Sequence, residues 1–256
     1  MARSNNIFTR IEKKYVLTEK QHSAIMPIMW EHMKLDMFGR STVSSLYYDT
    51  PDNRIIRSSI EKPVYKEKLR LRCYHTPDDH GEAFVELKKK YKGIVYKRRI
   101  QMEHASAVAF LDGTGPVPSG KDAQIGREIA YFLQFYKGIR PAYAVFCDRL
   151  ALVDKIDENL RLTIDANIRY RIEDLDLRHG SYGKTLLPSG NYVMEVKTAS
   201  AMPLWMTHLL NENEVYPSSF SKYGTAYAKE LRRKLESGHN SVNIQLSDDW
   251  RKNNAI

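Results

Sequence analysis

Basic side chains recur at every second residue along segment 65–74 of this chain. The segment carries Lys66, Lys68, Arg70 and Arg72 in alternation with Leu69, Leu71 and Cys73. Because successive side chains of a strand point to opposite faces of a sheet, these cations share one face. Like charges that neighbour each other on a sheet repel unless an anion neutralises them. The spacing therefore indicates a surface that binds phosphates, which Arg can contact through two parallel hydrogen bonds.

Five further segments show the same alternation of polar and apolar residues. Their polar sets are Arg10, Glu12 and Lys14; Glu86, Lys88 and Lys90; Lys97 and Arg99; Arg161, Thr163, Asp165, Asn167 and Arg169; and Glu195 and Lys197. Carboxylates among these cations would repel phosphate unless they bind a hard cation. Mg²⁺ and Mn²⁺ prefer oxygen ligands, supplied by one or two carboxylates together with phosphate oxygens and water. The mixture predicts metal-assisted phosphoryl transfer.

A simpler interpretation is that each segment is a strand with one solvated face, which alternates polar and apolar residues without any ligand. The repeated excess of cations from one segment to the next favours phosphate binding instead. The sequence contains neither G-x-x-x-x-G-K-[ST] nor a G-x-G-x-x-G after a strand, so side chains must bind the phosphates. Its eight histidines form no cluster with metal-ligand spacing.

The composition limits the class of partner. The chain has 40 Lys and Arg residues against 31 Asp and Glu, a formal net charge of +9. This excess indicates an anionic partner, whether nucleic acid, an anionic membrane or a phosphorylated small molecule. Cys73 and Cys147 are the only cysteines, which excludes a disulfide framework. Residues 1–9 lack the apolar core of a signal peptide, and no run approaches the roughly 20 apolar residues of a membrane span, so we expect a cytoplasmic protein.

The hydrophobic pattern predicts the elements that position these residues. Strands are expected over 7–17, 43–49, 65–74, 83–90, 94–102, 143–154, 160–169 and 191–198, with 172–177 as an optional ninth. Helices are expected over 18–34, from the turn at 50–53 to about 59, within 104–136 with a break at 113–120, and over 219–235. Consecutive strands joined by hairpin turns favour an α+β protein with a closed antiparallel β-barrel and flanking helices. We predict one domain over residues 1–236 and a polar C-terminal tail over 237–256.

Several short motifs, taken in order, resemble a known family. They are residues 8–15, 45–50, 68–74, 85–90, 148–149, 163–165, 194–197 and 220–223. In this order they are similar to the polyphosphate-polymerase domain of the vacuolar transporter chaperone (VTC) family, within the triphosphate tunnel metalloenzyme (CYTH-like) superfamily. The resemblance covers about residues 7–235. It implies a barrel tunnel that binds ATP or another triphosphate and polyphosphate, with Mn²⁺ or Mg²⁺ as cofactor.

Residue roles follow from the resemblance, motif by motif. The catalytic phosphate-binding residues that it implies are Lys14, Arg70, Arg72, Lys88, Lys97, Arg149 and Lys222. The further substrate-binding residues are Arg10, Lys68, Lys90, Arg99, Arg161, Lys197 and Ser221. The implied metal ligand is Glu195, and Glu12, Glu86 and Asp165 are weaker candidates for a metal-binding or supporting role.

The first motif departs from the superfamily pattern E-x-E-x-K, because Arg10 replaces the first glutamate. The loss of one carboxylate favours ATP-dependent polyphosphate synthesis over two-metal hydrolysis. Two alternatives stay open: a tripolyphosphate or nucleoside triphosphate hydrolase with water as the acceptor, and a non-catalytic polyanion-binding module. We expect no nucleic acid partner and no membrane segment in this chain, while a separate membrane protein could be its partner.

Overall fold

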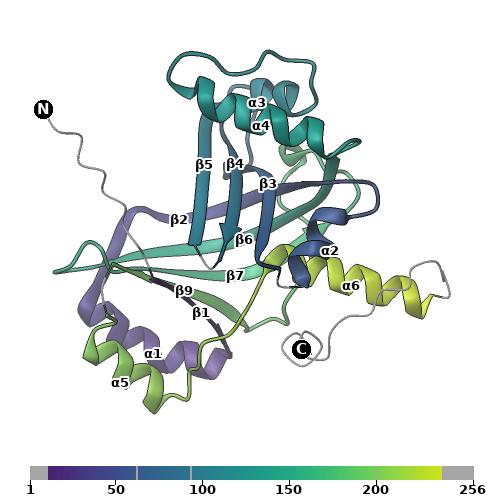
Figure 1. Ribbon diagram of the computed structural model, residues 1–256. Helices are drawn as coiled ribbons and strands as arrows, with labels where there is room; N and C mark the ends of the chain where they lie inside the picture. The colour runs from purple at the N-terminus through teal and green to yellow at the C-terminus, as the bar shows by residue number, and fades with distance from the viewer. Residues whose placement is uncertain (1–10, 62, 93, 200, 238–256) are drawn as a thin grey trace, which may run out of the picture. The chain divides into compact units, whose positions relative to one another are not determined.

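The structure is a computed structural model that describes residues 11–61, 63–92, 94–199 and 201–237 (Figure 1). Arg10, the start of the first predicted strand and almost all of the predicted C-terminal tail lie outside the described residues. The chain divides into two compact units. Unit 1 comprises Met1–Ser41, Asp148–Asn167 and Leu187–Phe220, and unit 2 comprises Thr42–Cys147, Ile168–Leu186 and Ser221–Ile256.

In the described part of the chain, nine strands form one sheet. They are β1 (Ile11–Leu17), β2 (Met33–Asp49), β3 (Tyr65–Tyr74), β4 (Glu82–Tyr91), β5 (Ile94–Glu103), β6 (Arg140–Asp154), β7 (Arg161–Arg171), β8 (Lys184–Thr185) and β9 (Tyr192–Thr198). Their order is β1-β9-β7-β6-β2-β3-β4-β5, with β8 paired to β7. The pairs β1–β9, β7–β9, β2–β3, β3–β4 and β4–β5 are antiparallel, which confirms the predicted α+β class.

The predicted closure of the barrel is not confirmed. The hydrogen-bonded path starts at β1 and ends at β5, and within the described residues no strand pairing joins these two ends. The alternation of side chains predicts which face of a strand is polar, but it carries no information about which strands pair at the edges of the sheet.

In unit 1, one face of β1, β9 and the first part of β7 packs against α1 (Glu19–His32) and α5 (Leu204–Glu212). Met29 of α1, Met194 of β9 and Met206 of α5 belong to this core and are fully buried. Helix α1 begins as predicted, because the Thr18 side chain accepts from the backbone N–H of Gln21 while the Gln21 side chain accepts from that of Thr18.

In unit 2, the apolar face of β3, β4 and β5 packs under α3 (His104–Leu111) and α4 (Ala123–Phe135) (Figure 1). Leu71, Val85 and Ile100 lie in this core with Phe110 and Phe132 of the two helices. Two more helices complete the unit, α2 (Arg54–Ile60) and α6 (Lys222–Glu236). The buried carboxylate of Asp49 joins them: it accepts from the backbone N–H groups of α2 and, at 2.6 Å, from the Tyr223 hydroxyl of α6.

Three predictions of local structure were wrong. Strand β2 begins at Met33, not at Val43, and the helix before it ends at His32. The segment 172–177 forms no strand, and α5 was missed. None of the described helices has the length and apolar character to cross a bilayer.

Candidate functional site

The predicted basic face of β3 lies beside equally basic faces of β4 and β5 in unit 2. The strand register places Lys68 opposite Lys88 and Lys88 opposite Lys97, so three lysines form one row across three strands. Directly opposed side chains have Cβ atoms about 5 Å apart, and like charges at this distance destabilise a sheet. The row is therefore a strong candidate for the site of a multiply charged anion.

The next row places Glu86 between Arg70 and Arg99. Its Oε2 atom lies 2.7 Å from Arg70 Nη2 and 3.8 Å from Arg72 Nε, and its Oε1 atom lies 2.6 Å from Lys97 Nζ and 3.3 Å from Arg99 Nε. Four cations surround this one carboxylate, so the group carries a net charge of +3. We call these five residues the Glu86 cluster.

The environment of Glu86 fixes its charge. The residue is 1% exposed, and burial alone would raise the pKa of Glu86. Arg70, Arg72 and Lys97 outweigh burial and hold that pKa well below its usual range. Cations already contact both oxygens of Glu86, and these contacts favour the predicted supporting role over that of a metal ligand.

The N-terminus of α6 adds a second group of donors in unit 2. Ser221 caps this helix by accepting from Gly224 N at 3.2 Å, and Lys68 Nζ donates to the same hydroxyl at 3.3 Å. Lys222 is the first residue of the helix. A helix N-terminus carries partial positive charge, so Lys68, Ser221 and Lys222 together favour an anion.

Tyr47 is not among the predicted site residues, yet it contacts the Glu86 cluster. Strand β2 places Tyr47 directly opposite Arg70, and the Tyr47 hydroxyl accepts from Arg70 Nη1 at 3.2 Å. Its ring stacks on Tyr223 of α6 with centroids 4.5 Å apart. Burial would raise the pKa of Tyr47, but Arg70, Arg72 and Lys222 lower it below its ordinary value. Tyr47 thus joins the cluster to the start of α6.

Unit 1 carries a different arrangement of charges. Across β1, β9 and β7 the register opposes Glu12 to Lys197, Lys14 to Glu195, Glu195 to Thr163, and Lys197 to Arg161. Cations and carboxylates therefore face each other between β1 and β9, whereas on β7 a second cation, Arg161, faces Lys197. Lys197 Nζ lies 2.8 Å from Glu195 Oε1, and Lys14 Nζ lies 3.3 Å from Glu12 Oε1.

Arg149 and Asp165 form a buried pair within unit 1. Arg149 donates through Nε at 2.6 Å and through Nη2 at 2.8 Å to the two oxygens of Asp165, which is 1% exposed. This two-point contact occupies the carboxylate, so Asp165 does not fit a metal-ligand role. Arg149 also acts on Glu195: burial would raise the pKa of Glu195, but Lys197, Lys14 and Arg149 hold it well below its usual range.

Glu12 and Glu195 contact lysines through one carboxylate oxygen each, and their role as metal ligands stays a prediction. They are diagonal neighbours on adjacent strands, a relation that places Cα atoms about 7–8 Å apart. Within the described part of the chain, no three His, Cys, Asp or Glu side chains gather as a complete metal cage. Two carboxylates suit Mg²⁺ or Mn²⁺ only when phosphate oxygens and water complete the coordination.

The described site residues thus fall into two groups, one in each unit. Those of unit 1 are Glu12, Lys14, Arg149, Arg161, Asp165, Glu195 and Lys197. Those of unit 2 are Lys68, Arg70, Arg72, Glu86, Lys88, Lys90, Lys97, Arg99, Ser221 and Lys222. Lys90 lies one row beyond the lysine row, opposite Lys66 and Val95, and Arg161 Nε donates to Glu158 O at 3.3 Å.

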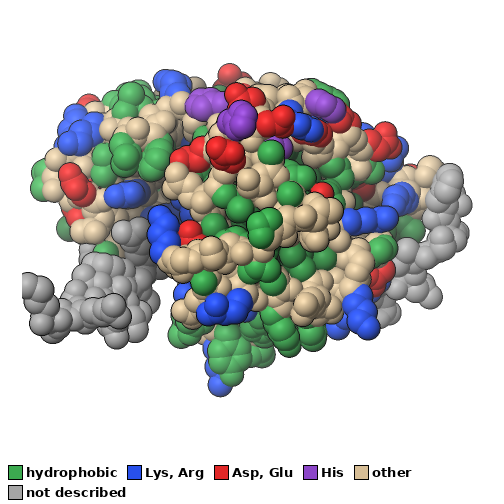
Figure 2. Space-filling model, turned by 90° about the horizontal axis from the view of Figure 1, so that it is seen from above, with side chains coloured by type: hydrophobic (Ala, Val, Ile, Leu, Met, Phe, Trp, Pro, Cys, Tyr) green, Lys and Arg blue, Asp and Glu red, His purple; other side chains and the backbone are tan. Residues whose placement is uncertain are grey.

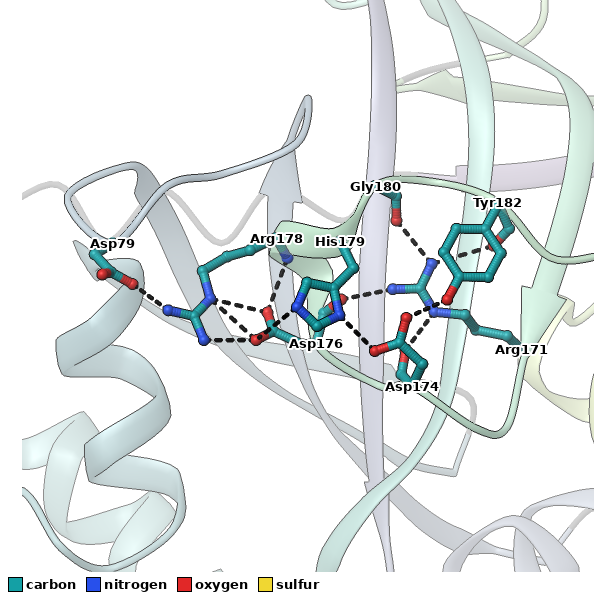
Figure 3. A network of polar contacts seen from close by, with 8 residues as sticks. All are labelled: Asp79, Arg171, Asp174, Asp176, Arg178, His179, Gly180 and Tyr182. Atoms are coloured by element: carbon teal, nitrogen blue, oxygen red, sulfur yellow. Dashed lines mark hydrogen bonds and ion pairs between the residues drawn. The ribbon is translucent and has the colours of Figure 1, made fainter.

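A further polar network in unit 2 was not predicted (Figure 3). The buried Arg171 guanidinium donates to the carbonyl oxygens of Asp174, Asp176, Gly180 and Tyr182 and lies between the rings of Phe146 and Tyr182. The backbone after β7 therefore curves around the Arg171 side chain. The carbonyl groups of Asp174 and Asp176 accept from Arg171 and not from a neighbouring strand, so 172–177 forms no strand.

The same network ends in charged pairs. Arg178 contacts both Asp176 and Asp79, and His179 Nδ1 lies 2.6 Å from Asp174. The hydrogen bond from Arg178 lowers the pKa of Asp176 to about 2. The space-filling view in Figure 2 shows histidine and acidic side chains beside one another on one face, with Lys or Arg among them. In the network these carboxylates contact arginine and histidine, so they stabilise a loop and are poor candidates for a phosphate site.

Comparison with known proteins gives a family and a fold. The sequence model of the VTC domain family matches residues 9–231. Subunit 4 of the vacuolar transporter chaperone complex of Schizosaccharomyces pombe is 25% identical over 224 residues, which are 72% of this chain and 31% of that protein. The same subunit of Trypanosoma brucei brucei is 24% identical over 225 residues, 73% of this chain and 28% of that protein. The chain therefore spans less than a third of the length of these relatives.

Among solved structures, a candidate adenylate cyclase from Bacillus halodurans is similar with a TM-score of 0.52. The match covers 83% of this chain and 93% of that chain at 13% sequence identity. At this identity the likeness shows a shared fold and nothing about the reaction.

Proposed function

The chain belongs to the VTC domain family, and on this premise we propose that it is a phosphotransferase that extends polyphosphate from ATP. The observation that carries the proposal is the stack of two cationic rows on β3, β4 and β5, where Lys68 and Lys88 lie beside the Glu86 cluster, which includes Lys97 and has a net charge of +3. A chain of phosphates supplies the several adjacent negative charges that such a surface lacks.

We assign the residues of unit 2 to phosphate neutralisation. Arg70, Arg72, Lys97 and Arg99 bind phosphate oxygens, and Glu86 keeps the four side chains oriented before the substrate arrives. The terminal phosphate oxygen of the polymer attacks the γ-phosphorus of ATP in line. The new P–O bond forms as the bond to the β-phosphate oxygen breaks, and ADP leaves with the electron pair. Rate acceleration then comes from positioning and from charge stabilisation, with no covalent protein nucleophile.

The carboxylates of unit 1 carry the proposed metal role. Glu195 and Glu12 would hold Mg²⁺ or Mn²⁺ together with phosphate oxygens, and the ion would supply charge neutralisation for phosphoryl transfer. Lys14, Arg149, Arg161 and Lys197 belong to the same group in unit 1 and would bind phosphate there. Glu86 and Asp165 are assigned to positioning cations, because arginines already contact their oxygens.

The test is to incubate the purified chain with ATP and Mn²⁺ and to follow polyphosphate on a stained gel and free phosphate in parallel. We expect polymer from the wild type and a rate lower by roughly 10²–10³ for Arg70→Ala. Glu195→Gln should abolish metal-dependent turnover. Lys14→Ala should also slow polymer formation. Lys13→Ala is its matched control, since Lys13 points to the opposite face of the same strand.

The two alternatives give different products. Free phosphate without polymer would assign the chain to the hydrolases that use water as acceptor. Polyphosphate retention that depends strongly on salt, without ATP consumption, would reduce the function to polyanion binding. Membership in a complex like that of the relatives is likewise a proposal, and co-purification from the source cell is its test.

A further inference from the structure

Apolar and aromatic side chains gather at the tip of the β4–β5 hairpin in unit 2. The register places Tyr65 opposite Tyr91 and Tyr91 opposite Ile94, and Tyr96 lies in the next row, opposite Lys89. Val64 joins them, because its carbonyl accepts from Lys92 N in the turn at 3.0 Å. All five side chains are exposed, with Ile94 at 57% and Val64 at 64%. We call Val64, Tyr65, Tyr91, Ile94 and Tyr96 the tip patch.

The tip patch continues the face that forms the core of unit 2. Farther along the same strands, Leu71, Val85 and Ile100 are covered by α3 and α4, which lie at one end of β3, β4 and β5, while the turn lies at the other end (Figure 1). Helix α4 ends at Phe135, and the hydroxyl of the next residue, Tyr136, donates to Glu67 Oε1 of β3 at 2.8 Å. Glu67 also accepts from the Tyr65 hydroxyl at 2.7 Å, so both of its carboxylate oxygens are hydrogen-bonded to tyrosines at this border. Among the described residues, the five side chains beyond this border are exposed.

Basic residues frame the tip patch. The segment 87–102 contains seven Lys and Arg residues and no Asp or Glu. Lys89 shares the patch face, in the row of Tyr96, and Lys92 Nζ lies 5.5 Å from the centre of the Tyr91 ring. A surface with this composition has two favourable interactions with an anionic lipid membrane. Its apolar side chains enter the acyl-chain region, and its lysines are attracted to the anionic headgroups.

We propose that the tip patch docks on the surface of an anionic lipid membrane. Ile94 and Val64 enter the boundary between headgroups and acyl chains, the three tyrosines lie at headgroup level, and Lys89 and Lys92 contact lipid phosphates. A soluble polyanion would attract the lysines equally but would gain nothing from Ile94 or Val64. The apolar residues therefore favour a membrane over polyphosphate or nucleic acid as the occupant.

This inference is independent of the proposed reaction. Lys88 and Lys97 of the lysine row point to the opposite face of β4 and β5 from Tyr91 and Tyr96, since alternate residues of a strand face opposite ways. Substitutions on the tip patch therefore spare the cationic rows. Docking through this face leaves the Glu86 cluster on the face turned away from the lipid.

The experiment is vesicle flotation of the full chain with phosphatidylcholine alone and with added phosphatidylglycerol. We expect binding only to the anionic vesicles. Tyr91→Ser/Ile94→Ser should weaken binding at least tenfold through lost apolar contact, and Lys89→Ala/Lys92→Ala should weaken it by a similar factor on anionic vesicles. Ile156→Ser is the matched control: this residue is 95% exposed in unit 1 and should leave binding unchanged.

A gain of signal provides a second measurement that does not depend on loss of binding. Ile94→Trp should shift its fluorescence emission to the blue when anionic vesicles are added. Equal binding of wild type and Tyr91→Ser/Ile94→Ser, or no binding to anionic vesicles, overturns the proposal. A change in oligomeric state of the double variant in sedimentation would assign the patch to a second copy of the chain, and loss of polyphosphate retention would assign it to a polyanion. Either result also overturns the proposal.

Discussion

At the scale of single residues, alternation in the sequence was enough to group the phosphate-site candidates by face. Lys68, Arg70, Lys88 and Lys97 share a face because strand parity fixes where each side chain points. The partners across strands were not predictable. Tyr47 contacts Arg70 only because β2 and β3 pair in one register, and parity does not define a register. For the same reason the sequence could not show that arginines contact the carboxylates of Glu86 and Asp165.

The Glu86 cluster leads to a prediction that separates a positioning role from a metal role. Glu86→Gln changes the charge of the cluster from +3 to +4 and should lower the melting temperature, because three half-buried arginines and Lys97 then lack a counter-charge. Polyphosphate should raise the melting temperature of the variant more than that of the wild type. Thermal unfolding with and without polyphosphate measures both effects. The exposed Glu82→Gln on the same strand is the control, and a loss of Mn²⁺-dependent stabilisation in Glu86→Gln alone would contradict the assignment.

The same residue predicts how stability depends on pH. The folded-state pKa of Glu86 lies below its unfolded value of about 4.3, so the unfolded chain binds more protons in this range. The contribution of Glu86 is present above pH about 4.3 and is lost as the pH falls below it. Urea unfolding at a series of pH values should therefore show a shallower acid-side decline for Glu86→Gln than for the wild type. Equal slopes would show that the cations do not stabilise the carboxylate.

At the scale of elements, strands β3, β4 and β5 agree with the prediction within one residue at each end. The alternation of polar and apolar residues over most of these strands, and the short connection between Tyr91 and Ile94, predict adjacent antiparallel strands. The first part of β2 was missed because its polarity does not alternate: Asp36 accepts from the backbone N–H groups of Phe38 and Gly39, and Gly39 has a φ of +50°. The strand predicted at 172–177 failed because Arg171 binds the carbonyls of that segment, a contact that local patterns do not reveal.

The start of α6 allows capping and phosphate binding to be separated. Ser221→Ala removes the cap and should cost about 1 kcal/mol in the free energy of unfolding. Ser221→Asp keeps a capping oxygen, so stability should be retained, while its charge beside Lys68 and Lys222 should weaken polyphosphate binding. Urea unfolding and polyphosphate binding should be measured for both variants. Equal polyphosphate affinity in Ser221→Asp and wild type would remove the start of α6 from the site.

At the scale of the whole molecule, the candidate groups contribute unequally to the net charge of +9. The Glu86 cluster carries +3, whereas the unit 1 group of four cations and three carboxylates carries +1. A strongly positive group attracts phosphate without a metal ion. A group whose charges nearly balance is better suited to a divalent metal ion that phosphate oxygens also coordinate. Removal of divalent metal should therefore abolish turnover and leave most of the affinity for polyphosphate.

Salt dependence measures how many cations of the molecule contact the polymer. Each Lys or Arg that neutralises a phosphate releases condensed counterions, so the logarithm of the binding constant falls with the logarithm of salt concentration by about one unit of slope per contact. Lys88→Ala should reduce the slope for polyphosphate by about one. Lys89→Ala, the next residue on the opposite face of β4, should leave it unchanged, although the net charge falls equally. Binding titrations at several salt concentrations measure both slopes, and equal slopes for the two variants would mean that overall charge, not the cationic rows, holds the polymer.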